Sequence, residues 1–361
     1  MPNLNYAEQW SPELLAILMQ GTLTSPFITS NVKWLDAKTF HFTQMSVSGY
    51  KNHKRTGGWN KGTFNQKDVP YTVTHDRDVQ FMVDKADVDE TNQTASIQNI
   101  SRIFEQTQVV PETDALFFSK VAQAAQNTEL YHSETSATEY TTENVFAKLK
   151  AILAAGKLRR YKANGSLIMY VSSDIMDKLE MSKEFTRKIE MTQIAEGGLG
   201  IETRVTDIDG VTLMEVVDDE RFYDRFDWDV VEGGFAPLKS KYAATTDTDV
   251  AEGKIYYTKS DSSYTVVAKP TKTNIATYYE KTVQGSRKIN VLVACGQTCK
   301  TVPKISSIYF FAPGSHTEGD GYLYQDRSLS DTFVFPNGKD NKIDSIYVDV
   351  DTTEYAGSCF Q

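Results

Sequence analysis

The sequence predicts an α+β fold, in which strand-rich and helical stretches follow one another along the chain. Three observations carry this prediction. The segment Tyr71–Val83 alternates apolar and polar residues, as half-buried strands do. Val110-Pro111-Glu112 then begins an apolar helical stretch, with proline in the first turn and an acid that the helix dipole favours. Farther along, Asp209-Gly210 between two apolar runs is a strong hairpin signal. At 361 residues the chain can bury a sizeable core and form more than one lobe.

The N-terminal region predicts a short helix. Ser11-Pro12-Glu13 combines a hydroxyl cap, a proline and an acid, so we expect a helix that ends near Gly21. It is apolar over much of its circumference through Leu14, Leu15, Ile17 and Leu18. Such a helix either docks on its own domain or lies as an arm on another molecule.

Residues 38–83 predict a long hairpin. Phe40 and Phe42 carry one apolar phase and Met45 and Val47 the opposite one, which indicates a bulge or twist between them. The connection between the two arms is rich in glycine and carries basic and aromatic residues, namely Lys51, Lys54, Arg55, Trp59 and Lys61. A hairpin of this length is not stable by itself in water. We therefore expect a partner surface, although a solvated loop or a nucleic-acid contact would also use these residue types.

An acidic corner follows the hairpin, at Asp84, Asp87, Asp89 and Glu90. The spacing lacks the glycine and glutamate that an EF-hand loop needs at its sixth and twelfth positions. Three interpretations stay open: a solvated bend, a contact with basic residues of another chain, or a different hard-cation site. The first two are favoured, and no metal ligand is assigned.

The rest of the chain alternates helices and strands. We expect helices from Val110 to about Gln126 and from Glu143 to Ala155, and a central strand at Leu167–Val171 because it is apolar throughout. Residues 239–284 are rich in Tyr, Thr and Val and predict a few short strands. They form either a small β module or a long loop of the main domain.

Composition and motifs argue against several functional classes. With 38 Lys+Arg against 48 Asp+Glu, the net charge of −10 gives no overall attraction to nucleic acid. The five histidines are scattered, and HExxH, GxSxG and Walker A patterns do not occur, so we predict no enzyme and no cofactor. Three cysteines are too few for a disulfide framework. An export signal and a membrane span are not expected, so we predict a protein made in a cytosol.

The order of these segments resembles the major capsid proteins of tailed bacteriophages. The resemblance is carried by residues 71–125, where the alternating strand passes through the acidic corner into the helix begun by VVPETDA. It is also carried by residues 289–348, with INVLVACGQTCKTVPKISSIYFFAP and GDGYLYQDRSLSDTFVFPN. It covers most of the chain outside 239–284.

This resemblance implies a Hong Kong 97-like fold with a particular domain organisation. We expect an extended N-terminal arm at 1–37, an extended hairpin loop (E-loop) at 38–83, a peripheral domain with the spine helix at 84–135, an axial domain at 136–238 and 285–325, an inserted β module at 239–284, and peripheral strands with the C-terminal tail at 326–361.

The resemblance also implies a function. The chain would be a structural virion protein, assembled in the host cytoplasm into pentamers and hexamers of an icosahedral head around double-stranded DNA, which it binds without sequence specificity. Contacts between subunits would use the hairpin tip (Lys51, Lys54, Arg55, Trp59, Lys61), the acidic corner (Asp84, Asp87, Asp89, Glu90) and the arm (Leu14, Leu15, Leu18). Expected partners are further copies of the chain, a separately encoded scaffolding protein, a portal and, as a further candidate, a decoration protein. Two alternatives are an encapsulin-type compartment shell and a β-rich adhesin, which would need an export signal.

Overall fold

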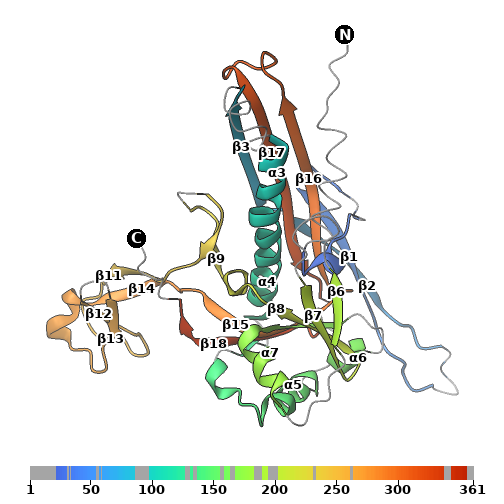
Figure 1. Cartoon of the computed structure of the whole chain (residues 1–361). Coiled ribbons are helices and arrows are strands. Elements are labelled where there is room, and N and C mark those ends of the chain that lie inside the picture. Colours follow the sequence, from blue (N-terminus) through green and yellow to red (C-terminus); the bar gives the residue numbers. More distant parts are fainter. Residues whose placement is uncertain are drawn as a thin grey trace.

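The computed structural model describes residues 22–30, 32, 34–53, 57, 59–85, 97–126, 131–132, 136–154, 158–162, 167–182, 189–193, 202–230, 233–260, 263–336 and 343–355. Over these residues the chain forms a seven-stranded, a three-stranded and a four-stranded sheet and two small two-stranded sheets. Figure 1 shows a long upright part, made of a helix beside the three-stranded sheet, that rises from the seven-stranded sheet. The four-stranded sheet projects to one side and a hairpin to the other.

The seven-stranded sheet is the base of the molecule. In spatial order it contains β4 (Tyr131–His132), β18 (Tyr347–Glu354), β15 (Arg287–Cys295), β5 (Leu167–Ser172), β8 (Val211–Val216), β7 (Glu202–Ile208) and β6 (Ile189–Gln193). One face packs against α5 (Val145–Ala154), α6 (Leu158–Lys162) and α7 (Ser173–Glu180). The other packs against the helix α4 (Val110–Gln126) and the N-terminal segment at Leu23 and Phe27. Both faces are therefore buried, which explains why β5 is apolar throughout and confirms its predicted central place.

The predicted Asp209-Gly210 turn joins β7 to β8. Both residues have positive φ, 53° for Asp209 and 76° for Gly210. These are the left-handed conformations that a two-residue type I′ turn requires, so the hairpin prediction is confirmed.

The upright part pairs a long helix with the three-stranded sheet. The sheet has the order β16 (Cys299–Phe311), β17 (Gly321–Val334) and β3 (His75–Asp84). The helix consists of α3 (Ile97–Phe104), one π-helical turn η2 (Glu105–Val109) and α4. The expected domain boundary at residue 325 falls inside β17, whose pairing with β3 continues across it. Residue 325 is therefore not a boundary between two structural units.

The helix does not begin at Val110, as the sequence predicted. Helical residues start at Ile97, and Pro111 lies inside the helix. Directly before this proline, the Val110 N–H donates to the Glu105 carbonyl, five residues back. A proline inside an α-helix removes a hydrogen bond and crowds the preceding turn. The wider π turn gives that crowded backbone more room.

The predicted hairpin is shorter than residues 38–83. β1 (Thr39–Val47) and β2 (Phe64–Thr72) pair in an unbroken register from Thr39↔Thr72 to Val47↔Phe64. Of the two alternatives predicted between Phe42 and Met45, a bulge or a twist, the bulge is therefore absent from this pairing. The last stretch, β3, leaves the hairpin and pairs with β17. An alternating strand looks the same in sequence whichever partner it has.

The segment 239–284 forms the four-stranded sheet, so its predicted short strands are confirmed. The spatial order is β11 (Lys241–Ala244), β14 (Tyr279–Val283), β12 (Tyr257–Ser260) and β13 (Ser263–Val266), with a short 3-10 helix η5 (Lys272–Thr277). This module has its own small core of Tyr256, Ile275 and Tyr278. Lys281 Nζ lies 2.8 Å from a Glu354 carboxylate oxygen and ties the module to β18. Short elements elsewhere are η1 (Ser25–Phe27), η3 (Ala137–Glu139), η4 (Asp219–Arg221), β9 (Phe226–Asp227) and β10 (Ala236–Pro237).

Removing the outer part of the module is expected to leave the rest of the chain folded. Ala244 and Tyr279 are register partners, so an Asn-Gly turn between them closes a β11–β14 hairpin and keeps the Lys281–Glu354 pair. Because the removed residues have their own core, we expect the thermal midpoint to fall by no more than about 2–4 °C. Circular dichroism and differential scanning fluorimetry check this.

A larger deletion provides the contrast. Joining Ala244 to Gln284 also removes β14, which leaves β11 as an unpaired edge and Glu354 without its lysine. This variant is expected to be less soluble than the shorter deletion. Insoluble protein from both deletions would show that the module is part of the main core.

Candidate subunit-contact surfaces

The hairpin β1–β2 is anchored at its base by aromatic packing. Phe40 is 1% exposed and lies with its ring 5.1 Å from that of Phe333 in an edge contact. Phe42 stacks on Phe335 at 4.5 Å. The proximal half of one hairpin face therefore rests on the chain's own β16–β17 region.

The distal half carries its apolar residues on the opposite face. Because the register is unbroken and side chains alternate along a strand, Met45 and Val47 point away from the face that Phe40 and Phe42 use. Phe64 is the register partner of Val47 and shares its face. Met45, Val47 and Phe64, called here the distal face, are 69%, 76% and 77% exposed. An isolated two-stranded ribbon with such an apolar face is at best marginally stable in water, so the distal face is a candidate contact surface.

The structure places part of the predicted hairpin tip. Trp59 is almost fully exposed, and Lys51 and Lys61 are exposed beside it. The Asn60 side chain donates to the carbonyl of Asn52 at 2.9 Å and holds the two sides of the tip together. The other two predicted tip residues, Lys54 and Arg55, lie outside the described residues.

The acidic corner is represented by Asp84 alone. This residue is exposed at the end of β3, where it is the register partner of Gly321. Asp87, Asp89 and Glu90 lie outside the described residues. Figure 1 shows β3 ending at the far end of the upright part, whereas the hairpin leaves from the other end. Within one chain, Asp84 and the hairpin tip are therefore not brought together.

The predicted arm residues Leu14, Leu15 and Leu18 also lie outside the described residues, but the segment that follows them is firmly attached. Leu23 and Phe27 are buried, and the Phe27 ring lies 4.5 Å from that of Phe117 on α4. The Tyr170 hydroxyl donates to the Leu23 carbonyl at 2.8 Å. The chain thus enters the molecule at a fixed place, between α4 and the seven-stranded sheet.

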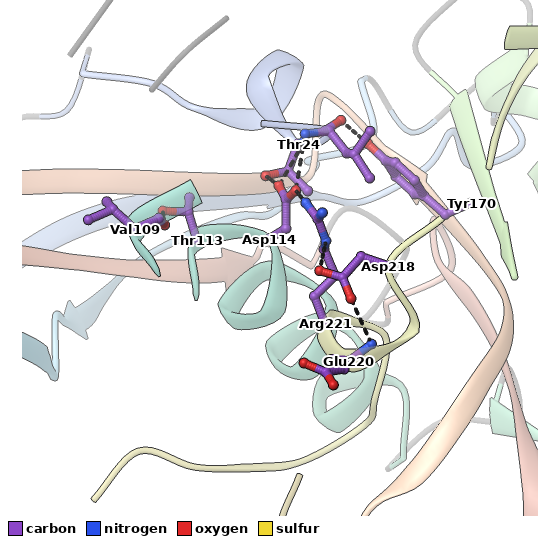
Figure 2. A network of polar contacts seen from close by, with 9 residues as sticks. Thr24, Val109, Thr113, Asp114, Tyr170, Asp218, Glu220 and Arg221 are labelled. Atoms are coloured by element: carbon purple, nitrogen blue, oxygen red, sulfur yellow. Dashed lines mark hydrogen bonds and ion pairs between the residues drawn. The ribbon is translucent and has the colours of Figure 1, made fainter. Parts of the chain in front are cut away.

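Asp114, on α4, is the polar centre of this attachment (Figure 2). Its fully buried carboxylate accepts from the backbone N–H groups of Leu23 and Thr24, both at 3.2 Å, and from the Thr24 hydroxyl at 2.8 Å. Arg221 donates to it from η4 at 3.0 Å and also lies 3.3 Å from Asp218. Burial raises the pKa of Asp114, while Arg221 and the other donors oppose that rise. Four donors directed at one carboxyl group fit its ionised form.

A second polar cluster lies between helix α4 and strand β3 of the three-stranded sheet. Glu112 accepts from His75 and lies 2.9 Å from the Arg77 guanidinium. Arg77 also donates to the carbonyls of Trp228 and Gly234, the latter at 2.7 Å. His75, Arg77, Glu112 and Gly234 line a cavity of about 550 Å³. The polar contacts fasten the loop between β9 and β10 to the upright part.

A metal-binding or membrane-spanning feature is not found in the described part of the chain. Its residues contain no group of three or more His, Cys, Asp or Glu side chains placed to hold a metal ion. None of the helices in that part is long and apolar enough to cross a bilayer.

Comparison with known proteins gives similarity in structure but not in sequence. Neither a family model nor a curated protein matches the sequence. The structure is similar to the capsid structure of the cyanophage P-SCSP1u, with a TM-score of 0.50, 11% identity, and coverage of 90% of this chain and 86% of that one. It is also similar to the mature capsid of bacteriophage PhiM1 (TM-score 0.47, 12% identity, 87% and 82% covered). A virus-like particle from Pyrococcus furiosus gives a TM-score of 0.44 at 9% identity, with 96% and 100% covered.

The cyanophage similarity extends over nearly the whole of both chains. A likeness of this extent at 11% identity establishes the fold. We conclude that this chain has the major capsid protein fold of tailed bacteriophages.

Proposed function

We propose that this chain is the structural subunit of an icosahedral phage head, in which copies associate into pentamers and hexamers around double-stranded DNA. The observation that carries the proposal is the distal face of the hairpin, whose three apolar side chains are more than two-thirds exposed on a ribbon that does not bury them. A second copy of the same chain is the partner that a shell supplies at every position. The fold supports this proposal because it is a capsid fold.

The basic tip and the acidic corner fit the same proposal. The far end of the β1–β2 hairpin, where Lys51 and Lys61 are exposed, and the end of β3, where Asp84 is exposed, lie at opposite ends of the structure in Figure 1. Subunits that meet side by side can place the tip of one near the acidic end of another. Exposed pairs contribute roughly 0–1 kcal/mol each, so in this proposal they orient the contact while the distal face supplies most of its energy. Scaffolding, portal and decoration proteins and packaged DNA are proposed as the other partners, and the role is non-enzymatic.

Negative-stain imaging of the purified full chain tests the proposal. We expect closed shells of mixed size from the chain alone and shells of uniform size once a scaffolding protein is coexpressed. Uniform shells from the chain alone would argue against a separate scaffolding protein but not against the shell. Particles that enclose a protein cargo in the native host would point to a cellular compartment instead. A chain that stays monomeric at high concentration, both alone and when coexpressed with a scaffolding protein, would refute shell formation.

A further inference from the structure

Two carboxyl groups meet inside the upright part, at the π-helical turn. Glu105 is the first residue of η2 and is 5% exposed. Asp326 lies on the facing side of β17 and is 9% exposed. Their side chains are hydrogen-bonded to each other. A hydrogen bond between two carboxyl groups needs a proton on one of them, because ionised carboxylates only accept.

The groups around this pair do not supply a compensating cation. In the described residues the basic side chains of the neighbouring strands are engaged elsewhere: Arg77 with Glu112 and Arg327 with Asp76. His75 also contacts Glu112, and Arg102 on α3 is exposed. The Tyr324 hydroxyl and the Arg327 backbone N–H also lie near Asp326, and Ser328 and Gln108, which line the same cavity, are uncharged. The register partners of Asp326 on the two flanking strands are apolar, Ile308 and Val79.

We propose that the Glu105–Asp326 pair is a proton-dependent contact that holds the π-helical turn of the spine helix against the three-stranded sheet. At acid and neutral pH the shared proton joins the two elements. Loss of that proton places two negative charges side by side in a poorly solvated site, which pushes η2 and α3 away from β17. Asp326 lines the cavity between the helix and the sheet, so water has a route to the pair. This inference concerns the single chain and does not depend on shell formation.

The direction of the pH effect follows from both groups. Burial above all, together with the Asp326 charge, raises the pKa of Glu105 from 4.5 to about 8. Burial likewise raises the pKa of Asp326 from 3.8 to about 6, although its hydrogen bonds oppose the rise. A pKa that is higher in the folded state than in the unfolded chain gives stability that is complete at acid pH and is lost as pH rises through the folded value. As pH rises, the contribution of Asp326 is therefore lost by about pH 6, whereas that of Glu105 continues to fall up to about pH 8, by up to about tenfold in the folding constant per pH unit.

Hydrogen exchange of the full chain tests this inference. After correction for intrinsic rates, amides in residues 101–109 are expected to exchange at least tenfold faster at pH 8.5 than at pH 6, while amides of β5 in the base are unchanged. Glu105→Gln carries a permanent amide donor and no ionisable proton, so it should remove most of the pH dependence at 101–109. Asp326→Asn removes the second charge but keeps the buried, ionisable Glu105, so it should reduce the pH dependence only in part; it serves if the first variant does not fold. Asp68→Asn, an exposed site on β2, is the matched carboxyl-to-amide control and should behave as wild type.

Each outcome decides the question. A wild-type profile at 101–109 that is flat between pH 6 and pH 8.5 refutes the inference without reference to any variant. A pH-dependent profile that Glu105→Gln and Asp326→Asn leave unchanged assigns the effect to another group and refutes it as well. Flattening by Glu105→Gln, or a partial reduction by Asp326→Asn, with a normal response in Asp68→Asn, supports the shared proton as the cause.

Discussion

Replacing Asp114 by alanine is expected to lower the free energy of unfolding by about 3–5 kcal/mol. The change removes one acceptor and leaves four donors unpaired at a site where Asp114 is fully buried. One of these donors is the Arg221 guanidinium, only 8% exposed, which would keep only the 40%-exposed Asp218 as a partner, and a buried charge that loses its buried partner is costly. The N-terminal segment at Leu23 and Thr24 also loses its attachment to α4. Urea unfolding followed by circular dichroism measures the loss.

A double substitution separates the charge from the packing. In Asp114→Ala/Arg221→Met both charges are removed together, so no buried ion is left unpaired, and about half or more of the lost stability should return. Arg221→Met alone leaves the buried carboxylate uncompensated and should be costly. Asp218→Ala is the control, because this partner of Arg221 is 40% exposed and should cost no more than about 1 kcal/mol. An Asp114→Ala protein within 1 kcal/mol of wild type would show that the network is not an anchor.

The base of the fold could be predicted because its signals are local. The strand at Leu167–Val171 is apolar throughout, and this composition alone predicts that it is buried. The Asp209-Gly210 turn is determined by two adjacent residues. The stripe of Val145, Leu149, Ile152 and Leu153 likewise marks α5, and all four are buried. In each case neighbours in sequence decide the structure.

The upright part could not be predicted in the same detail because its structure depends on distant pairings. The alternation of residues 75–83 predicts an arm of the hairpin, yet the partner of β3 is β17, roughly 240 residues farther along the chain. Proline after an apolar pair is a typical helix start, so the preceding helical residues from Ile97 were missed. The π turn that accommodates Pro111 leaves no separate mark in the sequence.

The sequence predicts only part of the candidate contact surface. The change of apolar phase between Phe42 and Met45 predicts a bulge or a twist, but one strand alone cannot show whether its register shifts. With the register known, the same phase change means that the apolar residues switch to the opposite face. The role of Asp114 could not be predicted from the sequence. It lies on a helix with no nearby cation in sequence, and its partners Thr24 and Arg221 are 90 and 107 residues away along the chain. Only the fold brings these three residues together.

Replacing the distal face by serine, as Met45→Ser/Val47→Ser/Phe64→Ser, is expected to abolish shell formation while leaving the chain folded. These side chains are already exposed in the single chain, so their loss costs the monomer little. Burying a Met, Val or Phe side chain is worth about 1.5–3 kcal/mol, so each contact between copies would lose roughly 4–9 kcal/mol. Since a closed shell repeats the contact at every subunit, a loss of this size at each one cannot be offset elsewhere. Sedimentation velocity and negative stain measure assembly, and far-ultraviolet circular dichroism monitors the fold.

The opposite hairpin face supplies the matched control. Ser46, Asn65 and Lys67 lie at the same depth of the hairpin as the distal face and are also exposed, but they point to the other side. A triple alanine variant at these positions changes as many side chains in the same ribbon and should still assemble. If both triple variants fail, the hairpin backbone rather than its distal face makes the contact. If the serine variant forms normal shells, the distal face is not buried between copies, and the exposed apolar residues need another partner. The two variants together therefore determine which side of the hairpin faces the neighbouring subunit, which the fold of one chain alone does not fix.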